Sequence, residues 1–352
     1  MFHVPRIRKT FLAAASLLLL GQAAGAEPLY TVGIVPMMVV PSSETYGAAI
    51  NNNGKTGAEM YQTGGGISSW RCGAAGCKQI LPLPNSQHHS GIFVGGINDA
   101  GNVVGTSPYL YFTRAFLFDG KTTKNIGFGD GPDLESTGHG INNVGMLVGS
   151  TETLDQKTRA FVWDNGSLRR LGTLGGDNSY GYGINDHGDV VGSSDLANGQ
   201  EHAFLLRAGG SMRDLGTLGG TQSEAYAINQ SRQVVGCSKT AGDASRQAFI
   251  YTGGLMQGLP TLGGDTACAY SINKAGWAVG HSTITPGGFY YRGFVYDGEK
   301  VYNLNDVLTA DDKATWLITH ARGINKKGQI VGTATNLVSG KVQAVVLTPV
   351  TR

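Results

Sequence analysis

The chain has 352 residues, a formal net charge of +2 and 55 glycines, and only 15% of its residues are charged. Glycine at about twice its usual frequency, with many short runs of valine, isoleucine and phenylalanine, predicts an all-β protein with tight turns. Basic residues form no block beyond the N-terminus, so electrostatics gives no case for binding nucleic acid or an anionic membrane surface.

The first 26 residues have the pattern of a secretory signal peptide. A basic segment over 6–9, a largely apolar segment over 11–20 and small residues at 24–26 follow one another. The apolar segment is too short to span a bilayer, which needs about 20 residues, and no later run is long enough. We therefore expect a secreted mature chain, residues 27–352. Loss of three basic residues leaves it 24 Lys and Arg against 25 Asp and Glu, a net charge of −1.

One motif recurs seven times in the mature chain. It combines Ile-Asn, a short turn ending in glycine, and a hydrophobic pair followed by glycine. Spacings of 43 to 52 residues indicate an array of similar supersecondary units. The asparagines of the motif are Asn51, Asn98, Asn142, Asn185, Asn229, Asn273 and Asn325.

Each repeat of about 44 residues is expected to contain four short strands. In the fourth repeat, a strand at 180–184 leads through an Asn-x-x-Gly turn to a second strand at 189–192. The asparagine can bond its own backbone there, and the glycine supplies a positive φ. A third strand is expected at 202–206 and a fourth at 213–218, ending in Gly219-Gly220. Four strands joined by hairpins in this length predict one blade of a β-propeller.

Several of these segments resemble the bacterial extracellular HAF-repeat family. They are His-Ala-Phe at 202–204, Leu-Gly-Thr-Leu-Gly-Gly at 171–176 and 215–220, and the seven Ile-Asn motifs. The resemblance covers nearly the whole mature chain and implies a secreted or cell-surface repeat protein without an assigned biochemical role. It implies no catalytic residues, because the family motif describes turns and packing.

The two ends of the mature chain complement each other. The last repeat has a third strand at 342–347 and no fourth, whereas a spare strand at 29–35 precedes the first motif. The N-terminal strand can therefore complete the last blade and remove two exposed strand edges. We predict one domain over residues 27–352, a seven-bladed β-propeller, with an open solenoid as the alternative.

Four cysteines in the mature chain fit an oxidising compartment. Cys72 and Cys77 flank a flexible Gly-Ala-Ala-Gly turn, so we expect a local disulfide there. Cys237 and Cys268 lie in neighbouring repeats, where a bridge and two buried thiols are equal alternatives. The adjacent His88-His89 pair has poor geometry for a zinc site with the first two cysteines, and no calcium-loop spacing occurs. We expect no metal and no cofactor.

Function in repeat proteins resides where the repeats differ. Three residues before each motif asparagine, the inner strand is expected to face a central channel. Five repeats carry a large polar side chain at this position, and these side chains could ring a pocket and stack on a sugar. They could instead pack between blades, which is the plainer interpretation. The five residues are His139, Tyr182, Tyr226, Tyr270 and Arg322.

The sequence contains no G-x-S-x-G nucleophile elbow and no distinct Ser-His-acid set. It therefore favours a monomeric secreted module that binds a glycan or a protein through one face of the propeller. A propeller-type hydrolase or lyase acting on extracellular polysaccharide is the alternative. A hydrolase of that kind would need two carboxylates about 5–9 Å apart in a cleft.

Overall fold

The structure of the protein is a computed structural model, and within the residues that it describes the fold is all-β. It has 28 strands, one short α-helix, α1 (Ala310–Thr315), and one 3₁₀ turn, η1 (Ala241–Asp243). The expected signal peptide and the His88-His89 pair lie outside these residues. The described residues are 29–37, 43–84, 91–110, 112–127 and 134–350.

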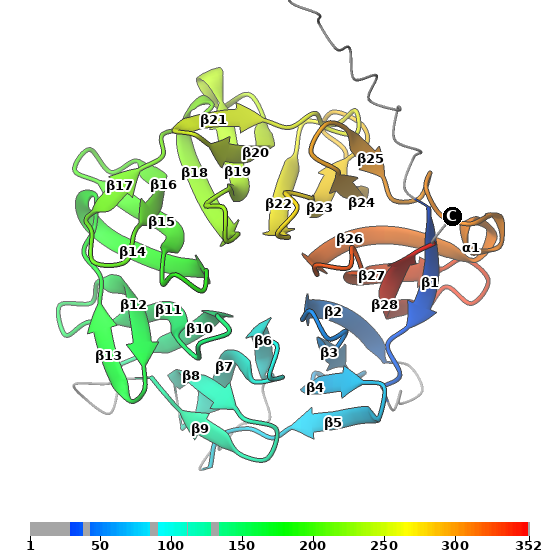
Figure 1. Ribbon diagram of the computed structural model, residues 1–352, viewed down its shortest axis with the longest axis horizontal. Coiled ribbons are helices and arrows are strands. Elements are labelled where there is room, and N and C mark those ends of the chain that lie inside the picture. The colour runs from blue at the N-terminus through cyan, green and yellow to red at the C-terminus, as the bar shows by residue number, and fades with distance from the viewer. Residues whose placement is uncertain (1–28, 38–42, 85–90, 111, 128–133, 351–352) are drawn as a thin grey trace, which may run out of the picture.

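The strands form antiparallel sheets that radiate from a central axis like the sectors of a disc (Figure 1). Five sheets have four strands each, and one has eight because two groups of four join through a single parallel pair, Glu201 and Gln222. The innermost strands are β2 (Glu44–Ile50), β6 (Phe93–Ile97), β10 (Ser136–Ile141), β14 (Gly175–Ile184), β18 (Gly219–Ile228), β22 (Ala267–Ile272) and β26 (Trp316–Ile324).

Each innermost strand is followed outward by the next strands along the chain. The second strands are β3 (Thr56–Tyr61), β7 (Val103–Tyr109), β11 (Leu147–Glu152), β15 (Val190–Leu196), β19 (Val234–Thr240), β23 (Ala278–Thr283) and β27 (Ile330–Asn336). The third strands are β4 (Ile67–Gly73), β8 (Phe112–Phe118), β12 (Thr158–Asp164), β16 (Glu201–Leu206), β20 (Arg246–Thr252), β24 (Tyr291–Tyr296) and β28 (Val342–Pro349). The outermost are β5 (Gly76–Ile80), β9 (Thr123–Asn125), β13 (Ser167–Arg170), β17 (Met212–Asp214), β21 (Leu255–Gly258), β25 (Val301–Asn303) and, beside β28, β1 (Tyr30–Ile34).

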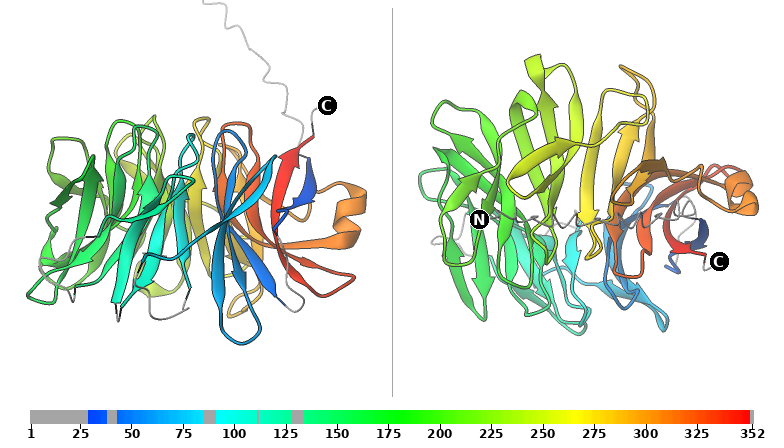
Figure 2. Two further views of the ribbon diagram at one scale, coloured as in Figure 1. Left: turned by 90° about the horizontal axis from the view of Figure 1, so that it is seen from below. Right: turned by 45° about the horizontal axis from the view of Figure 1, so that its top comes forward.

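The terminal strands β1 and β28 lie side by side (Figure 2), in the pairing that the sequence predicts. Their antiparallel ladder runs from Tyr30 opposite Pro349 to Ile34 opposite Val345. The insertion before β26 covers the start of the other edge of β1. The N–H of Tyr30 donates to the carbonyl of Val307 at 2.8 Å, and the N–H of Val32 donates to the Asp312 carboxylate at 3.1 Å. The N-terminal strand is thus hydrogen-bonded on both sides.

The Leu-Gly-Thr-Leu-Gly-Gly segment is not the outermost strand, so the strand expected at 213–218 is wrong in its bounds. In the fourth repeat β17 ends at Asp214, and Gly219 opens the next innermost strand. The strand ends before the first leucine in both copies of the segment, Leu171 and Leu215, although only Gly216, and not Gly172, has a positive φ. The intervening Leu215 is buried, and its N–H donates to the carbonyl of Ala203 at 2.9 Å.

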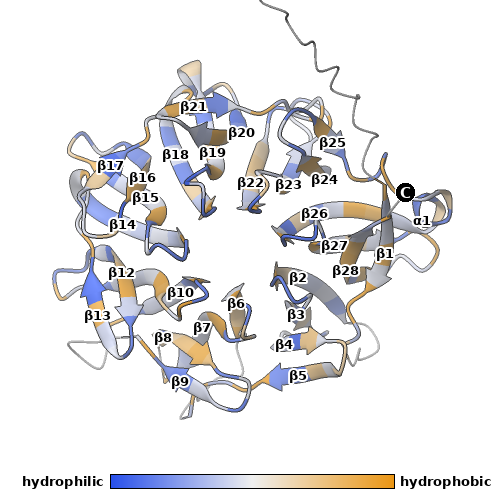
Figure 3. Ribbon diagram, in the orientation of Figure 1, coloured by the Kyte–Doolittle hydropathy of each residue, from blue (hydrophilic) through white to orange (hydrophobic). Residues whose placement is uncertain are grey.

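Hydrophobic residues occur on strands of every sheet (Figure 3). The core lies between neighbouring sheets, because both faces of the second strands are buried: Val190 packs in a cluster with Val148, and the adjacent Val191 packs in another with Val234. Each third strand of the clearest repeats buries a phenylalanine at its centre. The glycine that closes the motif makes room for it: a Cβ on Gly192 would lie 2.9 Å from the ring of Phe204 and 1.8 Å from the carbonyl oxygen of Tyr180. The buried phenylalanines are Phe116, Phe161, Phe204, Phe249 and Phe294.

The motif asparagines join the sheets as well as the turns. The Asn185 side-chain oxygen accepts the N–H groups of His187 and Asp189, both at 3.0 Å, as the turn requires. Its amide nitrogen donates to the carbonyl of Asn229 in the next repeat at 3.2 Å. Equivalent bonds connect every neighbouring pair and close a cycle, in the order Asn51, Asn98, Asn142, Asn185, Asn229, Asn273, Asn325 and back to Asn51.

Candidate functional site

Each innermost strand carries a β-bulge three residues before the motif asparagine. In β14 the register with β15 shifts between Gly181 and Gly183, so Tyr182 is an extra residue without a partner. A bulge of this kind redirects a side chain out of the regular alternation. The same shift occurs in all seven innermost strands, at Ala48, Gly95, His139, Tyr182, Tyr226, Tyr270 and Arg322.

Small residues flank six of the seven bulges on both sides, because neighbouring strands approach closely there; at the exception, Gly95, one flanking residue is Val94. A Cβ on Gly181 would lie 2.5 Å from a methyl of Val148, and one on Gly183 would lie 2.7 Å from the carbonyl oxygen of Tyr226. Larger side chains would push the strands apart. The pattern small–variable–small is therefore the sequence signal of this channel position.

The five large side chains at these bulges contact one another in sequence order and line one wall of a cavity of about 740 Å³. We call His139, Tyr182, Tyr226, Tyr270 and Arg322 the aromatic arc. Ring centroids are 5.3 Å apart for the first pair, 5.4 Å for the second and 5.1 Å for the third, and the Arg322 guanidinium carbon lies 4.4 Å from the last ring. The arc residues pack on each other and also face the cavity, which combines both interpretations of the sequence.

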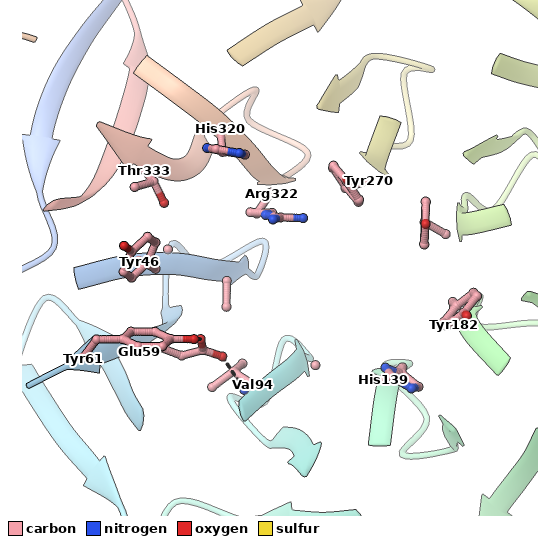
Figure 4. A pocket seen from close by; sticks show the side chains of 14 residues that line it. Tyr46, Glu59, Tyr61, Val94, His139, Tyr182, Tyr270, His320, Arg322 and Thr333 are labelled. Carbon is pink, nitrogen blue, oxygen red and sulfur yellow. Dashed lines mark hydrogen bonds between the residues drawn. The ribbon is translucent and has the colours of Figure 1, made fainter. Parts of the chain in front are cut away.

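The opposite wall comes from the first repeat, whose bulge residue is the small Ala48, and from the last repeat (Figure 4). Tyr46 and Tyr61 meet edge to face with ring centroids 5.0 Å apart, and the Tyr61 hydroxyl donates to Glu59 at 3.3 Å. His320 and Thr333 complete this side. Sequence reasoning missed these five residues because it considered one position per repeat. Two further positions recur: two residues before each bulge, and directly after the Val-Gly of the motif.

Burial sets the protonation of the cavity. It raises the pKa of the Glu59 carboxyl, although the Val94 N–H, which donates to Glu59 at 2.9 Å, opposes the shift. Burial lowers the pKa of His139 to about 4, and burial together with Arg322 lowers the pKa of His320 to about 4. Both imidazoles are therefore neutral near pH 7. Among the described residues Glu59 is the one carboxylate in the cavity lining.

Both pairs of cysteines form disulfides. The Cys72–Cys77 bond confirms the local bridge, and Cys237–Cys268 resolves the pairing that the sequence left open. The second bond joins β19 to β22 of the neighbouring sheet beside the arc, across the boundary between sheets that we call a seam. The Arg246 guanidinium donates to Cys237 Sγ at 3.0 Å and to Glu224 at 2.6 Å. Glu224 in turn accepts a hydrogen bond from the Tyr226 hydroxyl.

The next seam holds two histidines at the positions of those cysteines. Cys237 lies opposite Glu224 within its sheet, and His281 lies opposite Cys268 in the same register. The rings of His281 and His320 are 4.8 Å apart across the seam. Burial lowers the pKa of His281 to about 3, and the nearby His320 and Arg322 contribute.

A second cavity of about 400 Å³ is lined by the asparagine turns. It lies next to the arc cavity along the axis, because each motif asparagine follows its bulge residue by three positions. The side chains that line it are largely committed to the asparagine cycle. We therefore place the candidate site at the arc.

Two aspartates that follow Gly-Gly pairs have structural partners. Asp177 pairs with Lys157 at 2.8 Å, and Asp265 accepts the N–H of Gly287 at 2.8 Å. In the described part of the chain no three His, Cys, Asp or Glu side chains gather in a way that could hold a metal ion. No helix among the described residues is long and apolar enough to cross a membrane.

Comparison with known proteins gives a partial match to one family. The model of a family described as a protein of unknown function (DUF3466) matches residues 219–346. No curated protein matches the sequence.

Solved structures share the fold at low identity. A puromycin-hydrolyzing peptidase of Mycobacterium tuberculosis has 12% identity and a TM-score of 0.53, with 90% of this chain and 52% of that one covered. TolB from Acinetobacter baumannii has 13% identity and a TM-score of 0.49, covering 88% and 64%. Trypanosoma rangeli sialidase with a bound difluorosialic acid has 8% identity and a TM-score of 0.44, with 78% of this chain and 56% of that one covered. The chain thus spans about half to two thirds of these proteins. The similarity to the peptidase, with its TM-score of 0.53, supports an all-β, propeller-like fold and nothing further.

Proposed function

We propose that this protein is a secreted, monomeric glycan-binding module and that the aromatic arc is its binding surface. The observation that carries the proposal is the arc itself: five contiguous polar and aromatic side chains, each redirected by a bulge, along one wall of a cavity of about 740 Å³. Ligand sites commonly have volumes of about 300–1,000 Å³. Tyrosine faces offer apolar platforms for the C–H faces of a sugar, and their hydroxyls offer hydrogen bonds.

The architecture proposed with this function is a closed seven-bladed β-propeller over residues 27–352. Counting the two halves of the eight-stranded sheet separately gives seven groups of four strands. The asparagine cycle and the β1–β28 ladder support closure. We further propose membership of the HAF-repeat family and removal of residues 1–26. The two disulfides are consistent with an extracellular or periplasmic protein.

A propeller-type hydrolase or lyase is the alternative function. Glycoside hydrolysis normally uses two carboxylates on either side of the scissile bond. Glu59 is the only carboxylate among the described residues that line the arc cavity, which favours binding over hydrolysis.

A glycan array probed with the mature chain tests the proposal, followed by affinity measurements on the hits. Tyr182→Ala should weaken binding about tenfold or more, because stacking on one aromatic ring contributes on the order of 1 kcal/mol or more. Leu255→Ala, a change at an exposed side chain of the outermost strand β21, is the control and should leave affinity unchanged.

Three outcomes would count against this function. Hits that bind Tyr182→Ala as tightly as the parent chain would place the site elsewhere. Release of reducing ends from a bound polysaccharide would favour the hydrolase. An empty array together with capture of a defined protein ligand would favour a protein-binding module.

A further inference from the structure

Arg322 differs from the rest of the aromatic arc because it carries a permanent charge. Its side chain is exposed to the cavity, with the guanidinium stacked 4.4 Å from the centre of the Tyr270 ring. Stacking holds the group in place and leaves N–H donors at its edge free for a planar acceptor. Among the described residues, no carboxylate forms an ion pair with Arg322.

Other arginines near the axis are already paired. Arg246 donates to Glu224 at 2.6 Å behind the arc, and Arg232 donates to Asp189 at 2.8 Å near the asparagine turns. Both pairs are internal to the protein and position neighbouring strands. Arg322 faces the cavity with no carboxylate of the described residues in contact with it, although its charge acts on Glu59 across the cavity and partly offsets the rise that burial causes in the pKa of that carboxyl.

The groups facing Arg322 are neutral or already capped. His139 and His320 are neutral near pH 7 because burial lowers the pKa of each to about 4. Glu59 lies on the opposite wall, where the Val94 N–H and the Tyr61 hydroxyl donate to its carboxyl. Oxygen atoms of that carboxyl can still accept hydrogen bonds from ligand hydroxyls. The cavity therefore has a cationic donor at one side and an acceptor at the other.

We propose that the ligand is an acidic glycan whose carboxylate pairs with Arg322. Its hydroxyls face Glu59 and its ring faces lie on the tyrosines of the arc. This inference rests on the proposed glycan-binding function and adds the ligand class. A carboxylated sugar supplies all three complements in one unit: a planar anion that matches the guanidinium, hydroxyl donors, and a C–H face. Repulsion from Glu59 orients the sugar with its carboxylate toward Arg322.

Calorimetric titration of the mature chain with two matched pairs of saccharides tests this. The pairs are trigalacturonic acid with its methyl ester, and sialyllactose with lactose, which separate uronic from sialic carboxylates. We expect at least one acid to bind about tenfold or more tightly than its neutral counterpart, the range for a charge-assisted hydrogen-bonded pair. Arg322→Gln should remove that preference, so that the acid binds no more tightly than its neutral counterpart.

Arg213→Gln is the matched control, since Arg213 also lies over a tyrosine ring, 6.0 Å from the centre of Tyr251, but on the outer strand β17. It should keep the acid preference. Equal affinity for acid and neutral members would overturn the inference while the glycan-binding function stands. An acid preference that survives in Arg322→Gln would also overturn it. Absence of binding to every member of the panel would contradict both proposals.

Discussion

At the scale of single residues, position within the bulge decides what each repeat contributes. The same backbone feature presents alanine or glycine in the first two repeats, aromatic side chains in the next four and Arg322 in the last. The backbone is thus nearly the same in every repeat, and the two walls of the cavity differ only in their side chains. Burial keeps the histidines here uncharged, with the pKa of His281 lowered to about 3.

The buried histidines make stability depend on pH. The unfolded chain takes up protons on histidine below about pH 6.5, whereas His139, His281 and His320 in the folded chain do so only near pH 3 to 4. The unfolded state binds more protons in this interval, so the free energy of unfolding falls as the pH falls. The Tm of the parent chain falls between pH 7 and pH 4.5. For His281→Gln we expect this fall to be smaller by about 2 °C or more.

Exposed His187, replaced by glutamine, is the control for that experiment. Its melting curve should follow the parent chain at both pH values. If His281→Gln shows the same loss of Tm as the parent chain between the two pH values, burial of neutral histidine is not a source of the acid sensitivity.

At the scale of elements, the sequence predicted the hairpins well and the connections poorly. Alternating residues and the Asn-x-x-Gly turns defined the first two strands of each repeat. The Leu-Gly-Thr-Leu segment was misassigned because its first leucine, Leu171 or Leu215, is a buried residue that follows the end of the outermost strand, and sequence alone does not distinguish such a connection from a strand. The Cys237–Cys268 pairing was undetermined because it depends on the register between sheets. Tyr46, Glu59 and His320 were missed because they lie at repeat positions other than the bulge.

The insertion around α1 holds the N-terminal strand, and Asp312 is its key side chain. The Asp312 carboxylate accepts the N–H of Val32 at 3.1 Å and the hydroxyl of Thr309 at 2.7 Å. Asp312→Ala should lower the free energy of unfolding by about 1–3 kcal/mol because a charge-assisted bond is lost. Urea denaturation measures this change.

The neighbouring Asp311, an exposed carboxylate on the same helix, is the matched control. Asp311→Ala should change the free energy of unfolding by about 0.5 kcal/mol or less. Equal effects of the two substitutions would show that the hydrogen bond between Asp312 and Val32 of β1 does not contribute to stability.

At the scale of the whole molecule, two neighbouring layers along the central axis have different roles. The asparagine cycle joins every repeat to the next, with bonds of 2.8–3.2 Å. The arc, three residues earlier on the innermost strands, faces the larger cavity. The repeated motif fixes the frame, and the residues that vary between repeats line the proposed site. This division explains why a repeat pattern predicts the architecture but leaves the ligand open.

The most direct test is a crystal structure of the mature chain soaked with the tightest-binding saccharide from the array. We predict electron density for a sugar ring between Tyr226 and Glu59, within contact distance of the aromatic arc, and an acidic group against Arg322. Density confined to the outer strands, to the seams between sheets or to the cavity at the asparagine turns would contradict the assignment of the site to the arc.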